Sequence, residues 1–242
     1  MALKPRERKD IQLLCIADHV DPLIYAASLK ERFGNVQAVL SCGDLKAYYY
    51  EFIVSTLNVP FFYVLGNHSP FTLHPGLNVR TTTPQYQQGG DRIPAAQFQG
   101  GILVDGRCAR YREGDILIAG LGGSRRYNKG DNQYTETQMF FRIMRLVPQL
   151  LLNRIFRGRY LDIFVTHAPP RWIHDKEDLC HQGFRIFRWF LRVFRPVYMI
   201  HGHIHLYDRN EVRKTLYHET CVINAYDHYR LFYKGEKEIN ER

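Results

Sequence analysis

The sequence of 242 residues lacks the cysteine patterns of disulfide-linked scaffolds and zinc–thiolate sites. Its five cysteines are scattered, odd in number and include no CxxC pair. Disulfide frameworks use paired cysteines in oxidising compartments, and zinc–thiolate sites use closely spaced pairs. We therefore expect neither a disulfide framework nor a metal site built from thiolates.

Long apolar runs are also absent. No run approaches the roughly 20 residues that a membrane-spanning helix needs. The charged N-terminus MALKPRERKD gives way to IQLLCIA, which is too short for a signal peptide and is not followed by a small-residue cleavage site. The sequence thus predicts a soluble, cytoplasmic protein.

Acidic residues are few beside basic ones. There are 24 aspartates and glutamates against 33 lysines and arginines, which gives a formal net charge of +9. A basic balance favours phosphate esters, nucleic acid or an anionic membrane surface as partners and does not choose among them. The hydrophobic content of 45% suits a globular core, and we expect residues 1–242 to form a single domain.

Apolar runs alternate with amphipathic stretches in the N-terminal quarter of the chain. Residues 11–17, 38–42 and 59–65 are predicted strands, and residues 22–33 and 45–57 are predicted helices. Strand, helix, strand, helix, strand is typical of a parallel βαβαβ unit.

The rest of the chain is predicted to contain a long loop, further helices and further strands. Residues 69–100 show no periodicity and predict a long loop or small insertion. Thr135 and Gln138 form a possible capping box at the start of a helix, which we expect Pro148 to break into two pieces. Other patterns predict short strands within 101–121, strands at 160–167 and 197–203, a helix at 182–195 and antiparallel strands over 206–235.

Polar residues follow these predicted strands at their ends, where ligands bind in open parallel sheets. The set comprises Asp18, Asp44, Asn67, His68, His167, His203 and His205. Imidazoles and carboxylates without thiolates suit manganese, iron, zinc or nickel. In the stretch HGHIH, alternation turns His203 and His205 to the same side, and Gly202 lets the backbone approach closely.

In this order the motifs resemble those of the calcineurin-like metallophosphoesterases. The family pattern is D-x-H, G-D, G-N-H, a lone H and G-H-x-H. The chain offers the corresponding blocks over residues 11–206: Asp18-His19-Val20, Gly43-Asp44, Gly66-Asn67-His68, Thr166-His167 and Gly202-His203-Ile204-His205. The resemblance implies an α/β fold of four layers, α/β/β/α, in which two mixed sheets are flanked by helices.

The resemblance also implies roles. Asp44 would bridge two divalent ions; Asn67, His167 and His203 would complete one site, and Asp18 and His205 would hold the other. His68 would stand beside the substrate phosphate and assist the leaving group while a metal-activated hydroxide attacks phosphorus. The expected activity is metal-dependent hydrolysis of a phosphomonoester or phosphodiester.

One block departs from the family pattern. The histidine of the family's D-x-H block corresponds to Val20 in this chain, and valine cannot bind metal. His19 or Asp21 could replace it if the backbone turns either inward. Otherwise the Asp18 site is weakened, which leaves open a one-metal enzyme or a catalytically degenerate binding scaffold.

Basic segments suggest further contacts. Arg125 and Arg126 follow a predicted strand and are candidates for binding a substrate phosphate, although a solvated turn explains them equally. Residues 139–159 and 182–195 combine arginines with phenylalanines and leucines, a composition found in helices that lie on anionic membranes or simply pack on a sheet. The net charge leaves a nuclease as a further alternative.

Overall fold

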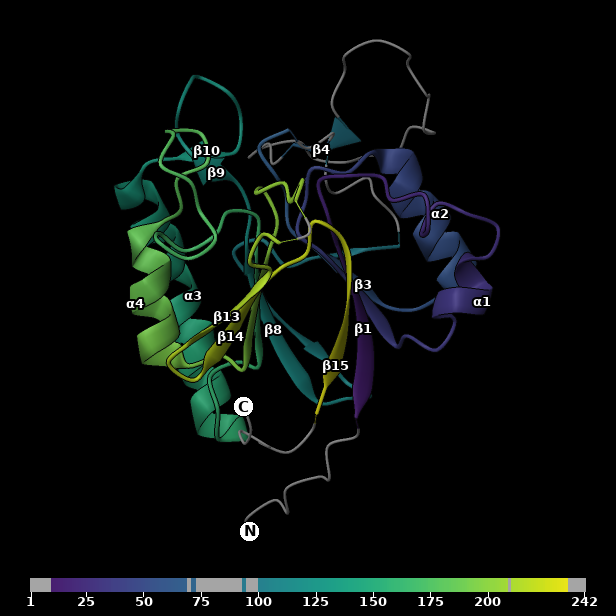
Figure 1. Ribbon diagram of the computed structural model, residues 1–242. Coiled ribbons are helices and arrows are strands. Elements are labelled where there is room, and N and C mark those ends of the chain that lie inside the picture. Colours follow the sequence, from purple (N-terminus) through teal and green to yellow (C-terminus); the bar gives the residue numbers. More distant parts are fainter. Residues whose placement is uncertain (1–9, 69–70, 73–92, 95–99, 209, 235–242) are drawn as a thin grey trace.

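Two large mixed sheets form the centre of the fold. The computed structural model describes residues 10–68, 71–72, 93–94, 100–208 and 210–234 (Figure 1). The first sheet has five strands in the order β15-β1-β2-β3-β6. Its strands are β1 (Ile11–Ala17), β2 (Ala38–Ser41), β3 (Phe61–Tyr63), β6 (Ile102–Leu103) and β15 (Asp227–Tyr233). β1, β2, β3 and β6 are parallel, and β15 is antiparallel to β1.

The second sheet has six strands in the order β13-β14-β12-β11-β8-β7. Its strands are β7 (Cys108–Tyr111), β8 (Ile116–Leu121), β11 (Ile163–Thr166), β12 (Tyr198–His201), β13 (Lys214–Tyr217) and β14 (Thr220–Asn224). The four central strands are parallel, and the edge strands β7 and β13 are antiparallel to their neighbours. Two small parallel pairs stand apart: β4 (Phe71–Thr72) with β5 (Ile93–Pro94), and β9 (Ser124–Arg125) with β10 (Gln133–Tyr134).

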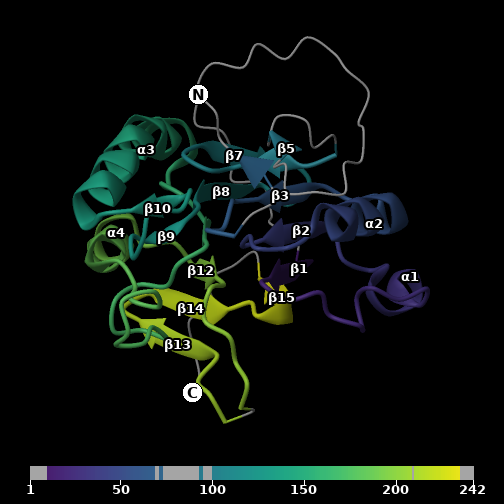
Figure 2. The same ribbon diagram turned by 90° about the horizontal axis from the view of Figure 1, so that it is seen from above.

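Helices cover the outer face of each sheet (Figure 2). α1 (Leu29–Phe33) and α2 (Ala47–Leu57) pack on the first sheet, and α3 (Glu136–Arg157) and α4 (Arg185–Phe194) pack on the second. Between the sheets lies an apolar core that includes Leu13, Cys15, Ile118, Val165 and Ile200. Because neighbouring residues of a strand face opposite sides, Leu14 and Ile16 join the helical side instead. The predicted four-layer architecture is confirmed.

α3 is one continuous helix, so the prediction that Pro148 divides it was wrong. Thr135 caps it as expected: its side chain accepts a hydrogen bond from the Gln138 N–H at 3.2 Å, and Gln138 Oε1 accepts one from the Thr135 N–H at 2.9 Å. The Pro148 ring lies on the exposed side. Buried residues before and after it, among them Ile143 and Leu150, hold both halves on the sheet, which outweighs one missing backbone hydrogen bond.

Other boundaries also differ from expectation. The helix predicted at 22–33 is reduced to Leu29–Phe33, because Asp21 accepts the N–H groups that follow it and forms turns instead. Of residues 206–213, those that the structure describes form no strand. The loop predicted at 69–100 lies largely outside the described residues. In the described part of the chain, every helix is too short or too polar to cross a membrane.

Candidate metal centre

The residues predicted to bind metal lie where strands of both sheets end. Each follows a strand within a few residues: Asp18 after β1, Asp44 after β2, Asn67 and His68 after β3, His167 after β11, and His203 and His205 after β12. The carboxyl ends of parallel strands meet at one edge of a sheet, and here the edges of the two sheets face each other.

His167 is the point where the two sheets meet. Its Nδ1–H donates to the Cys42 carbonyl at 2.8 Å, which leaves the lone pair on Nε2. That Nε2 lies 2.9 Å from Asn67 Oδ1 and 3.3 Å from Asp44 Oδ2. Asp18 also offers an oxygen, and with Asp44 and His167 it forms a group of ligand atoms within 4.8 Å of one another.

This donor set fits a divalent cation. Three acceptor atoms pointed at one another repel unless a proton or a cation lies between them. Nitrogen and carboxylate oxygen ligands of this kind suit zinc, manganese or iron. The Cys42 carbonyl fixes the ring and its tautomer, as carbonyl partners of metal-binding histidines commonly do.

The pKa shifts of the clustered residues show that their surroundings stabilise positive charge. Burial would lower the pKa of His167, but the charges of Asp44 and Asp18 raise it to about 9. Burial raises the pKa of Asp44, and the neighbouring His167 together with the His68 N–H outweighs it and holds that pKa below its ordinary value. Burial raises the pKa of Asp18 to about 7. A proton therefore occupies His167 at neutral pH when no metal is bound.

His203 and His205 come from the second sheet and lie outside the group of ligand atoms formed by Asp18, Asp44 and His167. The His203 N–H donates to Asp18 Oδ2 at 2.8 Å, and its ring lies 4.8 Å from that of His167. The His203 Nε2–H donates to the Cys180 carbonyl at 2.6 Å, which leaves the lone pair on Nδ1. Burial lowers the pKa of His203 to about 3, so this ring is neutral. His205 is less enclosed, with its Nδ1 2.7 Å from the Tyr207 hydroxyl.

The backbone is strained at these positions. Asp18, Asp44 and His203 have φ values of 64°, 56° and 68°, in the left-handed region that non-glycine residues rarely occupy. Strained backbone conformations of this kind are common at functional sites, where side chains must point in fixed directions. Glycines give the room: a Cβ on Gly66 would lie 1.9 Å from Asp44 Oδ1, and one on Gly202 would lie 2.5 Å from Asp18 Oδ2.

Neither suggested replacement for the missing ligand at Val20 turns toward the pocket. His19 Nδ1 contacts Asp227 Oδ1 at 2.7 Å, and half of the His19 side chain is exposed. Asp21 pairs with His228 and caps the turn at Leu23. Val20 itself packs against the apolar cluster on the helical side of the first sheet. The part of the pocket beside Asp18 therefore has fewer protein ligands than the part beside His167.

The first histidine of HGHIH has a separate role. His201 is fully buried, and its Nδ1–H donates to the Gly202 carbonyl at 2.9 Å. Its Nε2 accepts from His174 Nδ1 at 2.9 Å, and His174 Nε2 lies 2.8 Å from the Thr215 hydroxyl. Burial lowers the pKa of both rings, so two neutral histidines tie β12 to β13 behind the pocket.

His68 is exposed beside Asp44 and has a partner that the sequence did not single out. The Tyr127 hydroxyl accepts from Asn67 Nδ2 at 3.1 Å and lies 3.4 Å from His68 Nε2. One tyrosine thus orients both a predicted ligand and the predicted acid. Its position in the stretch GGSRRY, two residues after Arg125, was the only signal available in the sequence.

The two arginines of that stretch are engaged elsewhere. Arg125 is half-buried and forms an ion pair with Glu136, the first residue of α3, at 2.9 Å. Arg126 is exposed and donates to the Gln133 carbonyl at 3.3 Å. Either could reach a large substrate only by leaving its present partner.

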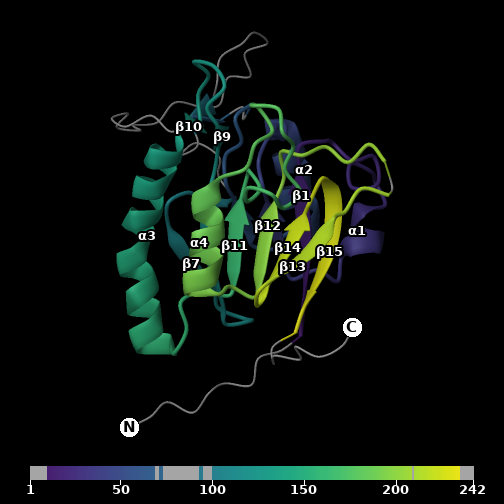
Figure 3. The same ribbon diagram turned by 60° about the vertical axis from the view of Figure 1, so that its left-hand side comes forward.

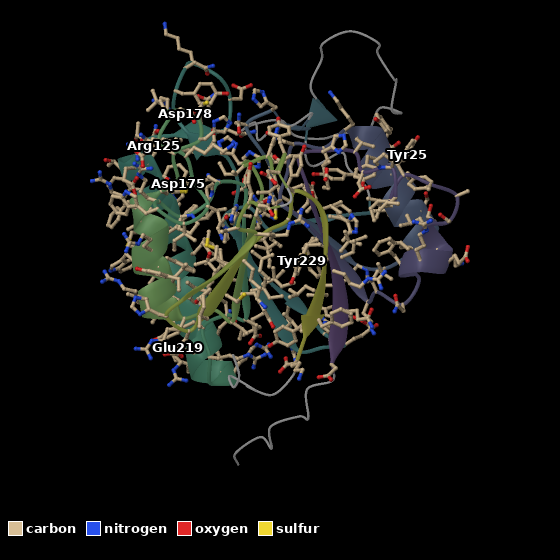
Figure 4. All side chains as sticks on the ribbon, viewed as in Figure 1. Tyr25, Arg125, Asp175, Asp178, Glu219 and Tyr229 are labelled. Atoms are coloured by element: carbon tan, nitrogen blue, oxygen red, sulfur yellow. The ribbon has the colours of Figure 1, made fainter. Side chains whose placement is uncertain are left out.

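A loop between β11 and α4 contacts His203. Arg171 pairs with Asp175 at 2.7 Å, and Cys180 Sγ donates to Asp178 Oδ1 at 2.8 Å. His181 Nδ1 lies 2.7 Å from the same carboxylate, and its ring is 5.5 Å from that of His203. Figure 4 shows Asp175 and Asp178 at the upper left, in the same region as Arg125.

Two face-to-face mixed sheets with outer helices, and aspartate, asparagine and histidine side chains where their strands end, define the metallo-dependent phosphatase-like class of fold. The sequence model of the calcineurin-like phosphoesterases matches residues 11–207. The chain belongs to the calcineurin-like phosphoesterase family. Membership implies metal-dependent hydrolysis of phosphate esters.

Two solved structures support the fold at low identity. One superposes with a TM-score of 0.61 at 14% identity, covering 94% of this chain and 100% of the other. TT1561 of Thermus thermophilus gives a TM-score of 0.56 at 13% identity, again over 94% of this chain and 100% of that one. A third match, GAP50, the anchor in the inner membrane complex of Plasmodium, gives 0.49 at 14%, over 89% and 71%. Curated protein sequences include no match.

Proposed function

We propose that this protein hydrolyses a phosphomonoester or phosphodiester with one or two divalent ions bound at the candidate centre. The residues that would hold them are Asp18, Asp44, Asn67, His167, His203 and His205. The observation that carries the proposal is the convergence of His167 Nε2, Asn67 Oδ1 and Asp44 Oδ2 within hydrogen-bond range, with no hydrogen atom available among them unless His167 is protonated.

The residues of the centre keep it attractive to a phosphate ester. When bound, a divalent ion there supplies positive charge that offsets the phosphoryl oxygens and makes water more acidic. Asp44 is ionised at neutral pH, and His203 is neutral. Because few of the ligands carry charge, the loaded centre stays electropositive and attracts the anionic substrate.

His68 and Tyr127 serve the leaving group. The Tyr127 oxygen accepts from Asn67 Nδ2, and its second lone pair accepts from His68 Nε2–H when both ring nitrogens carry a proton. That contact holds the ring in place, so that its Nδ1–H donates a proton to the departing oxygen and the ring becomes neutral. Tyr127 acts as a positioning residue in this scheme.

Because Val20 supplies no metal ligand, the two ions bind in a fixed order. The pocket beside His167 has the fuller ligand set and binds first. The pocket beside Asp18 binds second and more weakly, so activity depends on added manganese or a similar ion. A binding scaffold without activity is the alternative that this gap supports.

A hydrolysis screen tests the proposal. Purified protein is assayed on bis-p-nitrophenyl phosphate, p-nitrophenyl phosphate and single-stranded DNA, with and without added manganese. Asp44→Asn serves as the control because it keeps the shape and removes the charge. We expect manganese-dependent hydrolysis of a small ester that Asp44→Asn abolishes; metal binding without turnover of any ester would indicate the scaffold, and turnover of DNA alone would indicate a nuclease.

A further inference from the structure

Helix α3 is apolar on two opposite faces. Its inner face buries Met139, Ile143, Leu146 and Leu150 against the second sheet. A second set of large apolar side chains is exposed on the same helix: Phe141 (59%), Leu151 (47%), Leu152 (52%), Ile155 (72%) and Phe156 (73%). A helix that packs on a sheet normally turns polar residues outward, so these five side chains require another explanation.

The exposed set forms one stripe. Phe141, Pro148, Leu152 and Ile155 are spaced by seven, four and three residues, which places them on one side of a helix with 3.6 residues per turn. That side is about half a turn away from Ile143 and Leu150, on the face turned from the sheet. Figure 3 shows α3 at the margin of the molecule, beside α4, with its outer side uncovered by any described element. We name the stripe of Phe141, Leu151, Leu152, Ile155 and Phe156 the α3 outer face.

The charge around the α3 outer face has one sign. Residues 137–161 contain five arginines and residues 184–195 contain four, and neither segment contains an acidic residue. Arg145, Arg154, Arg157 and Arg192 are exposed and form no ion pair with the acidic residues that the structure describes. By contrast Arg195, at the end of α4, pairs with Glu219 at 2.8 Å.

The apolar side chains and the arginines together indicate which kind of partner could cover the α3 outer face. A second copy of the chain would bring arginines against arginines across a two-fold contact. Nucleic acid would engage the arginines and leave five large apolar side chains in water. A bilayer with anionic headgroups satisfies both features, since apolar side chains enter the acyl boundary while arginines meet phosphates.

We propose that the α3 outer face lies on an anionic lipid surface, with α3 parallel to the membrane plane. Ile155 and Phe156, the most exposed of the set, enter the boundary between headgroups and acyl chains. The C-terminal end of α3 lies away from the strand ends that carry the candidate centre (Figure 1), so docking leaves the pocket open. The membrane contact is independent of the proposed hydrolysis.

Co-sedimentation with vesicles tests the proposal. The probes are vesicles of phosphatidylglycerol mixed with phosphatidylcholine and vesicles of phosphatidylcholine alone. The test variant is Ile155→Ser with Phe156→Ser. The matched control is Leu216→Ser with Phe232→Ser, an aliphatic and an aromatic residue of β13 and β15 that are exposed to a similar degree, 69% and 58%. All four side chains are exposed, so both variants keep the fold, which thermal unfolding verifies.

We expect the wild type and the control to sediment with anionic vesicles, and the α3 variant to bind at least about tenfold more weakly, because two large apolar side chains no longer insert. Arg145→Gln with Arg157→Gln should also weaken binding by at least about tenfold, at roughly fivefold per arginine, and high salt should reproduce that loss.

Three results would overturn the proposal. One is equal binding to neutral and anionic vesicles, and another is binding that the α3 variant retains. The third is a wild-type dimer in sedimentation velocity that the α3 variant converts to monomer, which would show that a second copy covers the face. Hydrolysis of a soluble ester should be the same in wild type and all three double variants.

Discussion

Binding of a metal ion should displace protons from the pocket, and their number follows from the structure. The pKa of His167 is raised to about 9, so at pH 7 nearly every metal-free molecule carries a proton there. The pKa of Asp18 is raised to about 7, so about half carry a second proton. Asp44 has a lowered pKa and His203 a pKa of about 3, so neither contributes.

Filling the centre should therefore release about 1.5 protons per chain at pH 7, with roughly two at pH 6 and one at pH 8. By linkage the apparent affinity should rise about a thousandfold from pH 6 to pH 8, since the slope averages about 1.5 logarithmic units per pH unit. Isothermal titration of manganese into the metal-free protein, in buffers of different ionisation enthalpy, measures both quantities.

Asp18→Asn is the matched variant because it keeps the hydrogen-bonding shape and cannot ionise. It should reduce proton release at pH 6 from about two to about one and leave the contribution of His167 intact. Tight binding with less than about half a proton released at pH 7 would refute the reasoning, since it would mean that His167 Nε2 is not the position that proton and metal share.

Three further predictions follow from the same geometry. Equilibrium dialysis should find one tightly bound ion per chain and a second at least about tenfold weaker, because Val20, His19 and Asp21 add no ligand beside Asp18; two equal sites would contradict this. Tyr127→Phe should lower kcat roughly tenfold with unchanged metal content, because His68 loses its orienting contact, and an unchanged pH profile of kcat would argue against it. The metal-free protein should lose about 3 kcal/mol of stability as the pH rises from about 6.5 to 9, because the raised pKa of His167 stabilises the fold only while the ring is protonated. Saturating manganese should abolish that loss in chemical denaturation, and a stability that rises with pH without metal would contradict the sign.

The sequence predicted the framework because strand ends are local signals. Apolar runs that stop at Asp18, Asp44 and Asn67 mark the strands of a parallel sheet without reference to the rest of the chain. The order of the motifs then predicted the fold. In that fold His167 of the second sheet lies next to Asn67 and Asp44 of the first.

Features that depend on tertiary packing were not predictable in this way. Pro148 should interrupt a helix by its local chemistry, yet burial on both sides of it keeps α3 whole. Tyr127 lies in a turn with no periodic signal, and only the folded chain brings its hydroxyl to His68. The direction of His19 likewise depended on Asp227, 208 residues away.

The most direct test of the central claim is an anomalous diffraction map from crystals soaked in manganese. We expect a peak within coordination distance of His167 Nε2, Asp44 and Asn67 Oδ1, and a weaker one beside Asp18 and His205. A pocket that stays without a peak at saturating manganese, or a peak only at other residues, would contradict it.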